Sequence, residues 1–197
     1  SAMKKIVSLI MCLCSVYANS QEGIPFFVNY PASVYQAHNR NFDVVCDSCG
    51  NVYFANFEGI LHYDYSRWET IYTPGFSRVT RLFRDSEGRI WVGGYNVFGR
   101  IERDGRGCIT LRTLLSDLDT NFLGELEDMA EIDKRIYLKA TSGGYYTVQS
   151  DSILAPVQVL PAQLQEKWRN QTSVSMNRAF SLPGGETISI NLSLIHI

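Results

Sequence analysis

Short runs of apolar and aromatic residues alternate with clusters of turn-forming residues along most of the chain. Asp-Ser-x-Gly occurs at residues 47–50 and again at residues 85–88, an offset of 38. Each copy is followed by residues typical of a β-strand, Val52-Tyr-Phe54 in the first copy and Ile90-Trp-Val92 in the second. The pattern therefore predicts a repeat of strands joined by tight turns.

The two copies remain similar beyond these strands. Gly59 aligns with Gly99, and Asp64 aligns with Asp104, now at an offset of 40. The change of offset predicts two additional residues in a loop of the second copy. Because glycine and aspartate recur with the apolar runs, a whole unit is repeated rather than one turn motif.

Two weaker copies follow the second one. The third covers residues 132–138 and 143–148, and the fourth covers residues 178–190 with a turn at Pro183-Gly-Gly185. Each unit is expected to form four short strands joined by Asp, Ser and Gly turns. A period near forty residues with four strands per unit is typical of a propeller blade. We therefore predict an all-β fold, a partial β-propeller of about three to four four-stranded blades.

Composition restricts the chemistry that this fold can carry. The chain has 197 residues, of which 45% are hydrophobic and 19% charged, and its net charge is −2. This composition suits a packed domain, and the absence of a basic balance disfavours nucleic-acid binding. Only three histidines occur, too few for a histidine metal site or several acid–base roles. We expect no cofactor and no metal.

The first residues have the layout of an export signal. Lys4 and Lys5 precede an apolar run from Ile6 to Val16, and small residues follow at 17–21. We expect residues 1–21 to be tag and start residues with a secretory signal peptide. A permanent membrane anchor is the weaker alternative, because the run is short for a bilayer.

The last residues look foreign to the fold. Residues 192–197, Leu-Ser-Leu-Ile-His-Ile, match what one reading frame of a common transposase sequencing adapter encodes. We therefore expect the natural sequence to depart near Asn191 and the protein to continue. This division leaves residues 22–191 as the partial β-propeller domain.

The first copy contains a CxxC motif formed by Cys46 and Cys49. Cys49 stands where Glu87 stands in the second copy, so the Asp-Ser-x-Gly frame needs no thiol. A redox CxxC normally lies at a helix N-terminus, and a zinc site needs a second ligand pair. Only Cys108 remains after residue 21. We predict a structural turn, with or without a Cys46–Cys49 disulfide.

Together these motifs resemble a known family. The chain is similar to the periplasmic sensor region of bacterial regulators built from two-component-regulator propeller repeats, over about residues 23–150. The resemblance depends on several segments: Gly23-Ile-Pro-Phe26, Asn29-Tyr-Pro31, Val34-Tyr-Gln-Ala37, Asp47-x-x-Gly-Asn-Val-Tyr-Phe-Ala-Asn56, Gly59-Ile-Leu-His-Tyr-Asp64 with Trp68, Gly88 to Gly99, and Phe122-Leu-Gly-Glu-Leu126. Tyr65 and the two cysteines depart from it, and residues 155–177 match only loosely.

The resemblance implies a membrane receptor that senses a ligand outside the cytoplasm. Its output would be a histidine kinase or a helix-turn-helix segment, and neither activity is assigned to these residues. We therefore expect a non-enzymatic, periplasmic sensor fragment whose partner is a small molecule or an oligosaccharide. A homodimer formed through the full receptor is a further expectation. The alternatives are an exported propeller carbohydrate-binding protein or enzyme, and a purely structural scaffold.

Propeller geometry places the candidate ligand site. The innermost strand of a blade runs downward from the upper face, so the loop between the second and third strands returns to that face near the axis. Aromatic faces beside amide groups there suit a sugar ring or another small polar ligand. The candidate residues are Asn56, Phe57, Tyr95, Asn96 and Phe98. Thr141 and Ser142 are expected at the same mouth. The alternative is that Phe57 and Phe98 pack between blades.

Other conspicuous residues have structural interpretations. Trp68 and Trp91 fall in strand positions and are expected in blade cores. Residues 161–170 predict a short amphipathic helix that docks through Trp168 on a sheet edge. The acidic residues Glu125 and Glu127 flank Leu126 and share one face by strand alternation. With the adjacent Asp128 they are expected to be solvated charges rather than a glycosidase pair.

Overall fold

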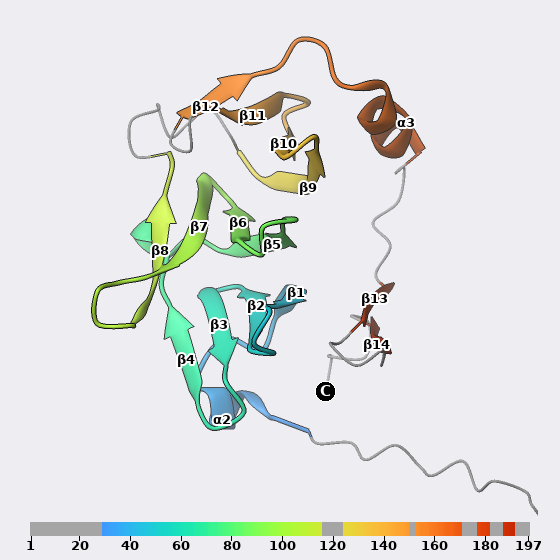
Figure 1. The fold of residues 1–197 in the computed structure, drawn as a ribbon. Helices are drawn as coiled ribbons and strands as arrows, with labels where there is room; N and C mark the ends of the chain where they lie inside the picture. Colours follow the sequence, from blue (N-terminus) through green and yellow to red (C-terminus); the bar gives the residue numbers. More distant parts are fainter. Residues whose placement is uncertain (1–28, 116–123, 150–152, 171–176, 182–186, 192–197) are drawn as a thin grey trace, which may run out of the picture.

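The strands of the described residues form three four-stranded sheets and one hairpin (Figure 1). The computed structural model describes residues 29–115, 124–149, 153–170, 177–181 and 187–191. Blade 1 contains β1 (Asn41–Cys46), β2 (Val52–Asn56), β3 (Gly59–Tyr63) and β4 (Trp68–Ile71). Blade 2 contains β5 (Val79–Arg84), β6 (Ile90–Gly94), β7 (Val97–Arg103) and β8 (Ile109–Thr113). Blade 3 contains β9 (Leu126–Ile132), β10 (Arg135–Ala140), β11 (Tyr145–Gln149) and β12 (Ile153–Pro156).

Every blade is an up-and-down antiparallel sheet in which each strand pairs with the next one along the chain. The first strands lie together, because β1 contacts β5 and β5 contacts β9. The fourth strands β4 and β8 lie at the opposite side (Figure 1). A paired hairpin follows, formed by β13 (Asn177–Ser181) and β14 (Thr187–Asn191). The predicted partial β-propeller is therefore confirmed.

The Asp-Ser-x-Gly turns fold because the aspartate organises the backbone. Oδ1 of Asp47 accepts N–H bonds from Cys49 at 2.8 Å and Asn51 at 2.9 Å. Gly50 and Gly88 both have left-handed φ values, 91° and 82°, which glycine adopts without a steric penalty. Cys49 takes part through its backbone, as predicted for a turn that needs no thiol.

Apolar side chains fill the two junctions between blades. One cluster joins blades 1 and 2 and is made of Tyr53, Ala55, Ile60, Ile71, Val79, Leu82, Ile90, Val92 and Ile109. A second cluster joins blades 2 and 3 and includes Trp91, Phe98, Leu126, Met129, Ile136, Leu138 and Tyr146. The prediction that Trp91 is a core residue is confirmed. Burial of these side chains supplies the main stabilisation of the arrangement.

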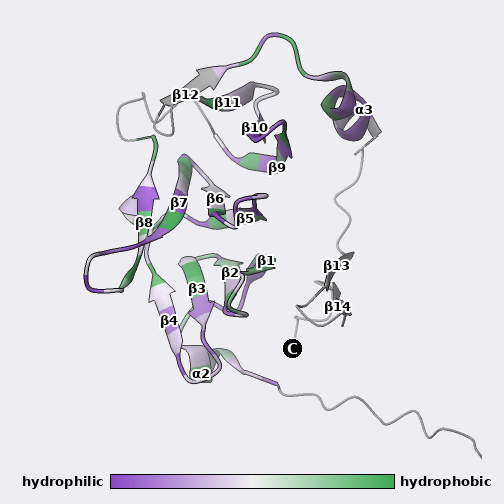
Figure 2. Ribbon diagram, in the orientation of Figure 1, coloured by the Kyte–Doolittle hydropathy of each residue, from purple (hydrophilic) through white to green (hydrophobic). Residues whose placement is uncertain are grey.

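The predicted helix is present as α3 (Ala162–Asn170), but it docks differently than expected. Leu164 and Trp168 pack against Ala130 and Tyr137 of blade 3. These two residues belong to β9 and β10, so the helix covers a sheet face and not a sheet edge. Its surface carries both hydrophobic and hydrophilic colours (Figure 2), as expected for one buried face.

A bulge recurs near the start of each innermost strand pairing. The register shifts between Asn41 and Asp43 in blade 1 and between Val79 and Arg81 in blade 2. In blade 3 the consecutive residues Lys139 and Ala140 pair with Asp128 and Leu126, so the additional residue is Glu127 of the innermost strand β9. A bulge bends the strand and redirects side chains.

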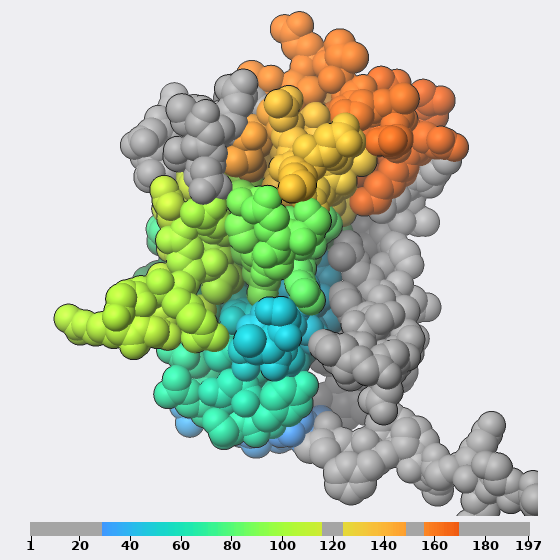
Figure 3. Space-filling model, viewed as in Figure 1, coloured from blue at the N-terminus to red at the C-terminus, as the bar shows by residue number. Residues whose placement is uncertain are grey.

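The change of offset between the first two copies has a different origin from the predicted one. The turns between second and third strands contain two residues in both blades, and the additional residues lie in β7. Gly99 is the third residue of the seven-residue β7, whereas Gly59 begins the five-residue β3. The longer β7 forms a hairpin with β8 that projects from the molecule (Figure 3).

The predicted signal peptide at residues 1–21 and the adapter-like residues 192–197 lie outside the described residues. Within the described part of the chain, none of the helices combines the length and hydropathy needed to cross a bilayer.

Candidate functional site

In each blade, the turn between the second and third strands lies beside one residue of the same blade. This residue comes directly before the innermost strand, which is β1, β5 or β9. The first turn residue donates its backbone N–H to the carbonyl of that residue, at 2.8 to 3.1 Å. The three pairs are Phe57 with Arg40, Tyr95 with Arg78, and Thr141 with Glu125. We call these six residues the mouth. Their equivalence shows that the sequence repeat brings one position of every blade to the same rim.

The strongest polar contact of the mouth joins blades 2 and 3. Arg78 donates from Nε to Oε1 of Glu125 at 3.1 Å and from Nη2 to Oε2 at 2.9 Å. Both side chains are about one-third exposed, at 35% and 31%. Hydrogen bonding to Arg78 holds the pKa of Glu125 below its usual value, with burial opposing it and the charges of Arg78, Arg81 and Arg40 adding to it. This bidentate pair fixes the rim between two blades.

Tyr95 and Phe57 present aromatic surface beside these charges. Tyr95 is 47% exposed, and its ring lies 5.1 Å from the guanidinium carbon of Arg78. Phe57 is 40% exposed, and its ring lies 4.7 Å from that of His38. Both predicted residues are therefore accessible at the rim, and Phe57 does not pack between blades.

Asn56 and Phe98 are buried instead of lining the mouth. The amide of Asn56 donates to the carbonyl of His38 at 2.6 Å and to Oδ1 of Asn41 at 2.8 Å, and it accepts the N–H of Glu58 at 3.0 Å. These bonds leave it in a structural role, tying the turn to the start of β1.

Phe98 stacks on Trp91 with ring centroids 5.6 Å apart, within the core between blades 2 and 3. It is fully buried. Phe98 therefore packs between blades, as the alternative to a ligand-binding role predicted. A ligand at the mouth would not reach its ring without opening that core.

Asn96 connects two blades through its turn. Its backbone N–H donates to the carbonyl of Gly124 at 2.8 Å, and its Oδ1 accepts the N–H of Gly124 at 2.8 Å. Its φ of 50° lies in the left-handed region, which asparagine tolerates better than most residues. Asn96 thus holds Tyr95 next to Glu125 through its backbone and its side-chain oxygen.

The loop between β4 and β5 adds aromatic residues that sequence reasoning missed. Tyr72 and Phe76 contact each other edge to face at 5.4 Å, and Phe76 is 73% exposed. Phe76 has a left-handed φ of 54°, an unusual conformation for a bulky residue. Oγ1 of Thr73 donates to the carbonyl of Ser77 at 2.6 Å and closes the loop. The Pro-Gly pair before Phe76 was the available signal, since it marks a tight turn.

The three acidic residues around Leu126 are engaged rather than simply solvated. Glu125 pairs with Arg78, and Nζ of Lys139 lies 2.8 Å from Oε2 of Glu127. Asp128 is buried and accepts the indole N–H of Trp168 at 2.8 Å. The expectation of solvated charge is wrong for Asp128 because α3 covers it.

The cysteines show no sign of redox chemistry. Cys46, Cys49 and Cys108 are unpaired in the structure. Burial, together with the charge of Asp47, raises the pKa of the Cys46 thiol, whereas a reactive thiol needs a lowered one. The Cys46–Cys49 disulfide stays a prediction. In the described part of the chain, no group of three or more His, Cys, Asp or Glu side chains could hold a metal ion.

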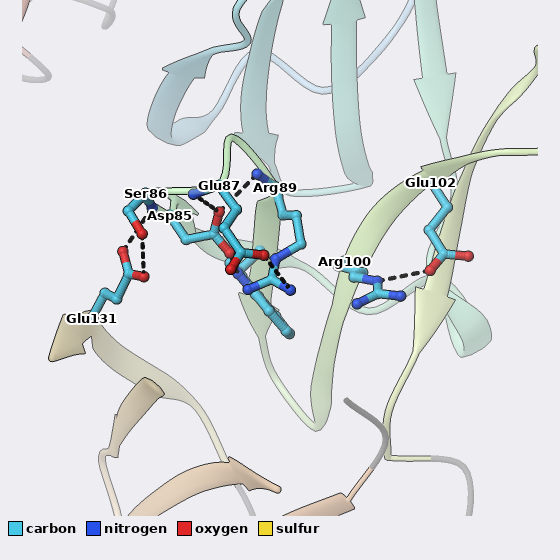
Figure 4. A network of polar contacts seen from close by, with 8 residues as sticks. Asp85, Ser86, Glu87, Arg89, Arg100, Glu102 and Glu131 are labelled. Atoms are coloured by element: carbon cyan, nitrogen blue, oxygen red, sulfur yellow. Dashed lines mark hydrogen bonds and ion pairs between the residues drawn. The ribbon is translucent and has the colours of Figure 1, made fainter. Parts of the chain in front are cut away.

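The blade 2 turn at the face opposite the mouth forms a separate network (Figure 4). Oδ2 of Asp85 accepts the indole N–H of Trp91 at 2.8 Å and Nε of Arg89 at 2.6 Å. Ser86 donates its N–H and its hydroxyl to Glu131 of blade 3, at 2.7 and 2.6 Å. This network connects blades 2 and 3 at the face opposite the mouth, and its role is structural.

Residues 74–96 match the family model described as two-component regulator propeller. The chain contains a two-component regulator propeller repeat. This propeller repeat spans η1 (Pro74–Phe76), β5, β6 and the turn residues Tyr95 and Asn96. It therefore includes one of the three mouth pairs, Tyr95 with Arg78, and it confirms the resemblance seen in the sequence. No curated protein sequence matches the chain.

The chain is similar to several solved structures at low identity. A streptogramin B lyase is 16% identical with a TM-score of 0.47, covering 77% of this chain and 54% of the lyase. A virginiamycin B lyase from Staphylococcus aureus is 15% identical with a TM-score of 0.47, covering 77% and 55%. The extracellular domain of a B. thetaiotaomicron protein described as a one-component system is 16% identical with a TM-score of 0.43, covering 76% and 19%. This chain spans about half of either lyase and about a fifth of that domain.

Proposed function

We propose that this propeller is the ligand-sensing part of an extracytoplasmic, membrane-bound receptor, and that the ligand binds at the mouth. The proposal is supported above all by one observation: Phe57 and Tyr95 expose aromatic rings at equivalent positions of two adjacent blades. Tyr72 and Phe76 extend this apolar surface along the connection between the same blades. Exposed aromatics grouped on one face, beside charged groups, favour a small polar ligand with a ring face. The two-component regulator propeller repeat supports a sensor role over other propeller functions.

The chemistry of the mouth favours binding over catalysis. A carboxyl group acting as a general acid needs a raised pKa. The pKa of Glu125 is lowered, chiefly by its hydrogen bonds from Arg78, so this carboxylate stays ionised and paired. The alternative of an exported propeller enzyme would need a second, differently tuned carboxyl beside it. Ligand binding would signal by favouring one of two receptor states, in proportion to its differential affinity for them.

Ligand binding to the 197-residue chain tests this function. A panel of neutral and acidic oligosaccharides is expected to raise its unfolding temperature, since a ligand that binds only the folded state stabilises it. Tyr95→Ala and Phe57→Ala should abolish the rise. Tyr65→Ala is the matched control, because Tyr65 is also exposed but follows β3 at the other face. A panel without any effect, or equal losses in the control, would refute the proposal.

A further inference from the structure

The equivalent mouth positions of the three blades do not carry the same charge. The three residues that precede the innermost strands are Arg40, Arg78 and Glu125. Arg78 and Glu125 neutralise each other through their bidentate pair. Arg40 remains as a positive charge at the rim of a chain whose net charge is −2. This rim therefore carries the positive charge of Arg40 together with the carboxylate of Glu58 in the neighbouring turn.

Arg40 is held in place without an acidic partner. No carboxylate of the described residues forms an ion pair with its guanidinium, which lies 4.9 Å from the ring centre of Phe42. Its backbone N–H donates to Nδ1 of His38 at 3.1 Å, and its carbonyl accepts the N–H of Phe57 at 3.1 Å. The neighbouring carboxylate of Glu58 accepts the backbone N–H of His38 at 3.2 Å. The Arg40 backbone is thus fixed while its charged group stays exposed.

An aromatic ring accompanies this cation. The backbone N–H of Phe57 bonds to the carbonyl of Arg40, so both exposed residues belong to the same rim, with the Phe57 ring against that of His38. A guanidinium recognises the two oxygens of a carboxylate or sulfate in one plane. The adjacent ring offers a flat apolar surface for the carbon skeleton of a sugar. The pair therefore matches a ring that bears an oxyanion.

We propose that the ligand of the mouth is an acidic saccharide whose oxyanion is bound by Arg40 and whose ring lies against Phe57. This inference rests on the proposed function and narrows the ligand class. Carboxylated and sulfated sugars share the chemistry that Arg40 recognises. The neighbouring Arg78 is already paired with Glu125, so it is not assigned to direct recognition.

Paired probes test the charge requirement. Binding of trigalacturonate, neutral galactotriose of the same linkage and a sulfated galactotriose is measured by calorimetry with the full 197-residue chain. Trigalacturonate or the sulfated sugar is expected to bind more tightly than galactotriose, and added NaCl should weaken only the acidic ligands. Arg40→Gln should weaken acidic binding by roughly tenfold to a hundredfold, the range for a charged hydrogen bond. Arg40→Lys should retain most of the affinity.

Arg106→Gln is the control, because Arg106 is exposed in the turn between β7 and β8, away from the mouth. It should bind like the parent chain, and far-ultraviolet circular dichroism should show that all variants fold. Equal binding of the neutral sugar, or unchanged affinity in Arg40→Gln, overturns this inference while leaving a ligand-binding mouth intact. If no probe binds but the wider panel stabilises the chain through Tyr95, the inference fails and the proposed function stands.

Discussion

The two junctions between described blades share an apolar interior but differ in their polar contacts. Between blades 2 and 3, Arg78 binds Glu125 at the mouth, and Ser86 binds Glu131 at the opposite end. The apolar core around Trp91 lies between these contacts. Both ends of this junction are therefore tied by charged hydrogen bonds across the blades, which restricts their relative movement.

The junction between blades 1 and 2 is tied less completely. Oδ2 of Asp43 accepts the N–H of Leu82 at 3.1 Å, but the equivalent mouth position is Arg40, which has no acidic partner among the described residues. His62 is buried inside the junction, and neither of its ring nitrogens has a hydrogen-bond partner there. The comparison indicates that one junction serves mainly stability, whereas the other keeps charge available for a ligand.

Removing the central side chain of the tied junction should have the largest effect. Trp91→Ala deletes a fully buried indole that stacks on Phe98 and donates to Asp85. We expect a loss of about 3–5 kcal/mol in the free energy of unfolding, measured by urea denaturation. Trp68→Ala in blade 1 is the control, because Trp68 is only partly buried in β4. Equal losses in both variants would contradict the importance of this core.

Sequence patterns predicted the blades because their causes are local. Asp47 and Asp85 bond to backbone groups within four residues, so the turn is visible in the sequence itself. Strand alternation then decides which side chains enter the junctions. The same reasoning located Phe57 and Tyr95 at the rim, since a two-residue turn leaves its side chains outside the sheet.

The charged part of the mouth could not be predicted in this way. Arg78 and Glu125 are 47 residues apart, and their pairing depends on how two blades meet. Asn56 and Phe98 lie next to the turns in sequence, but strand pairing extends to both and buries them. Burial of Asp128 required the position of α3, which the sequence placed at a sheet edge. These errors share one cause, contacts between units that are distant along the chain.

Lowering the pH should reduce the stability of the junction between blades 1 and 2, where His62 is buried. Burial lowers the pKa of His62, and the nearby charge of Arg103 also lowers it, while Asp64, Glu69 and Asp47 act in the opposite direction. The folded chain therefore binds this proton less readily than the unfolded chain, whose histidine has a pKa of about 6.5. The stability contributed by neutral His62 is complete above that pH and is lost as the pH falls towards the folded pKa. The slope should not exceed about 1.4 kcal/mol per pH unit for one proton.

Urea denaturation between neutral and mildly acidic pH measures this slope. His62→Leu should flatten it, because the variant keeps an apolar side chain beside Tyr53 and removes the titrating group. An unchanged slope in His62→Leu would show that another group controls the acid response.

A double-mutant cycle on Arg78 and Glu125 should show the smallest effect and compares the two mouth positions directly. We expect a coupling free energy of about 1 kcal/mol for Arg78→Gln and Glu125→Gln, since the pair is bidentate but about one-third exposed. The monodentate pair of Lys139 and Glu127 should couple less. Arg40→Gln should change stability by less than about 0.5 kcal/mol, because no folded-state ion pair is lost. A loss in Arg40→Gln as large as in Arg78→Gln would show that Arg40 is structural, and it would remove the reason to assign it to a ligand.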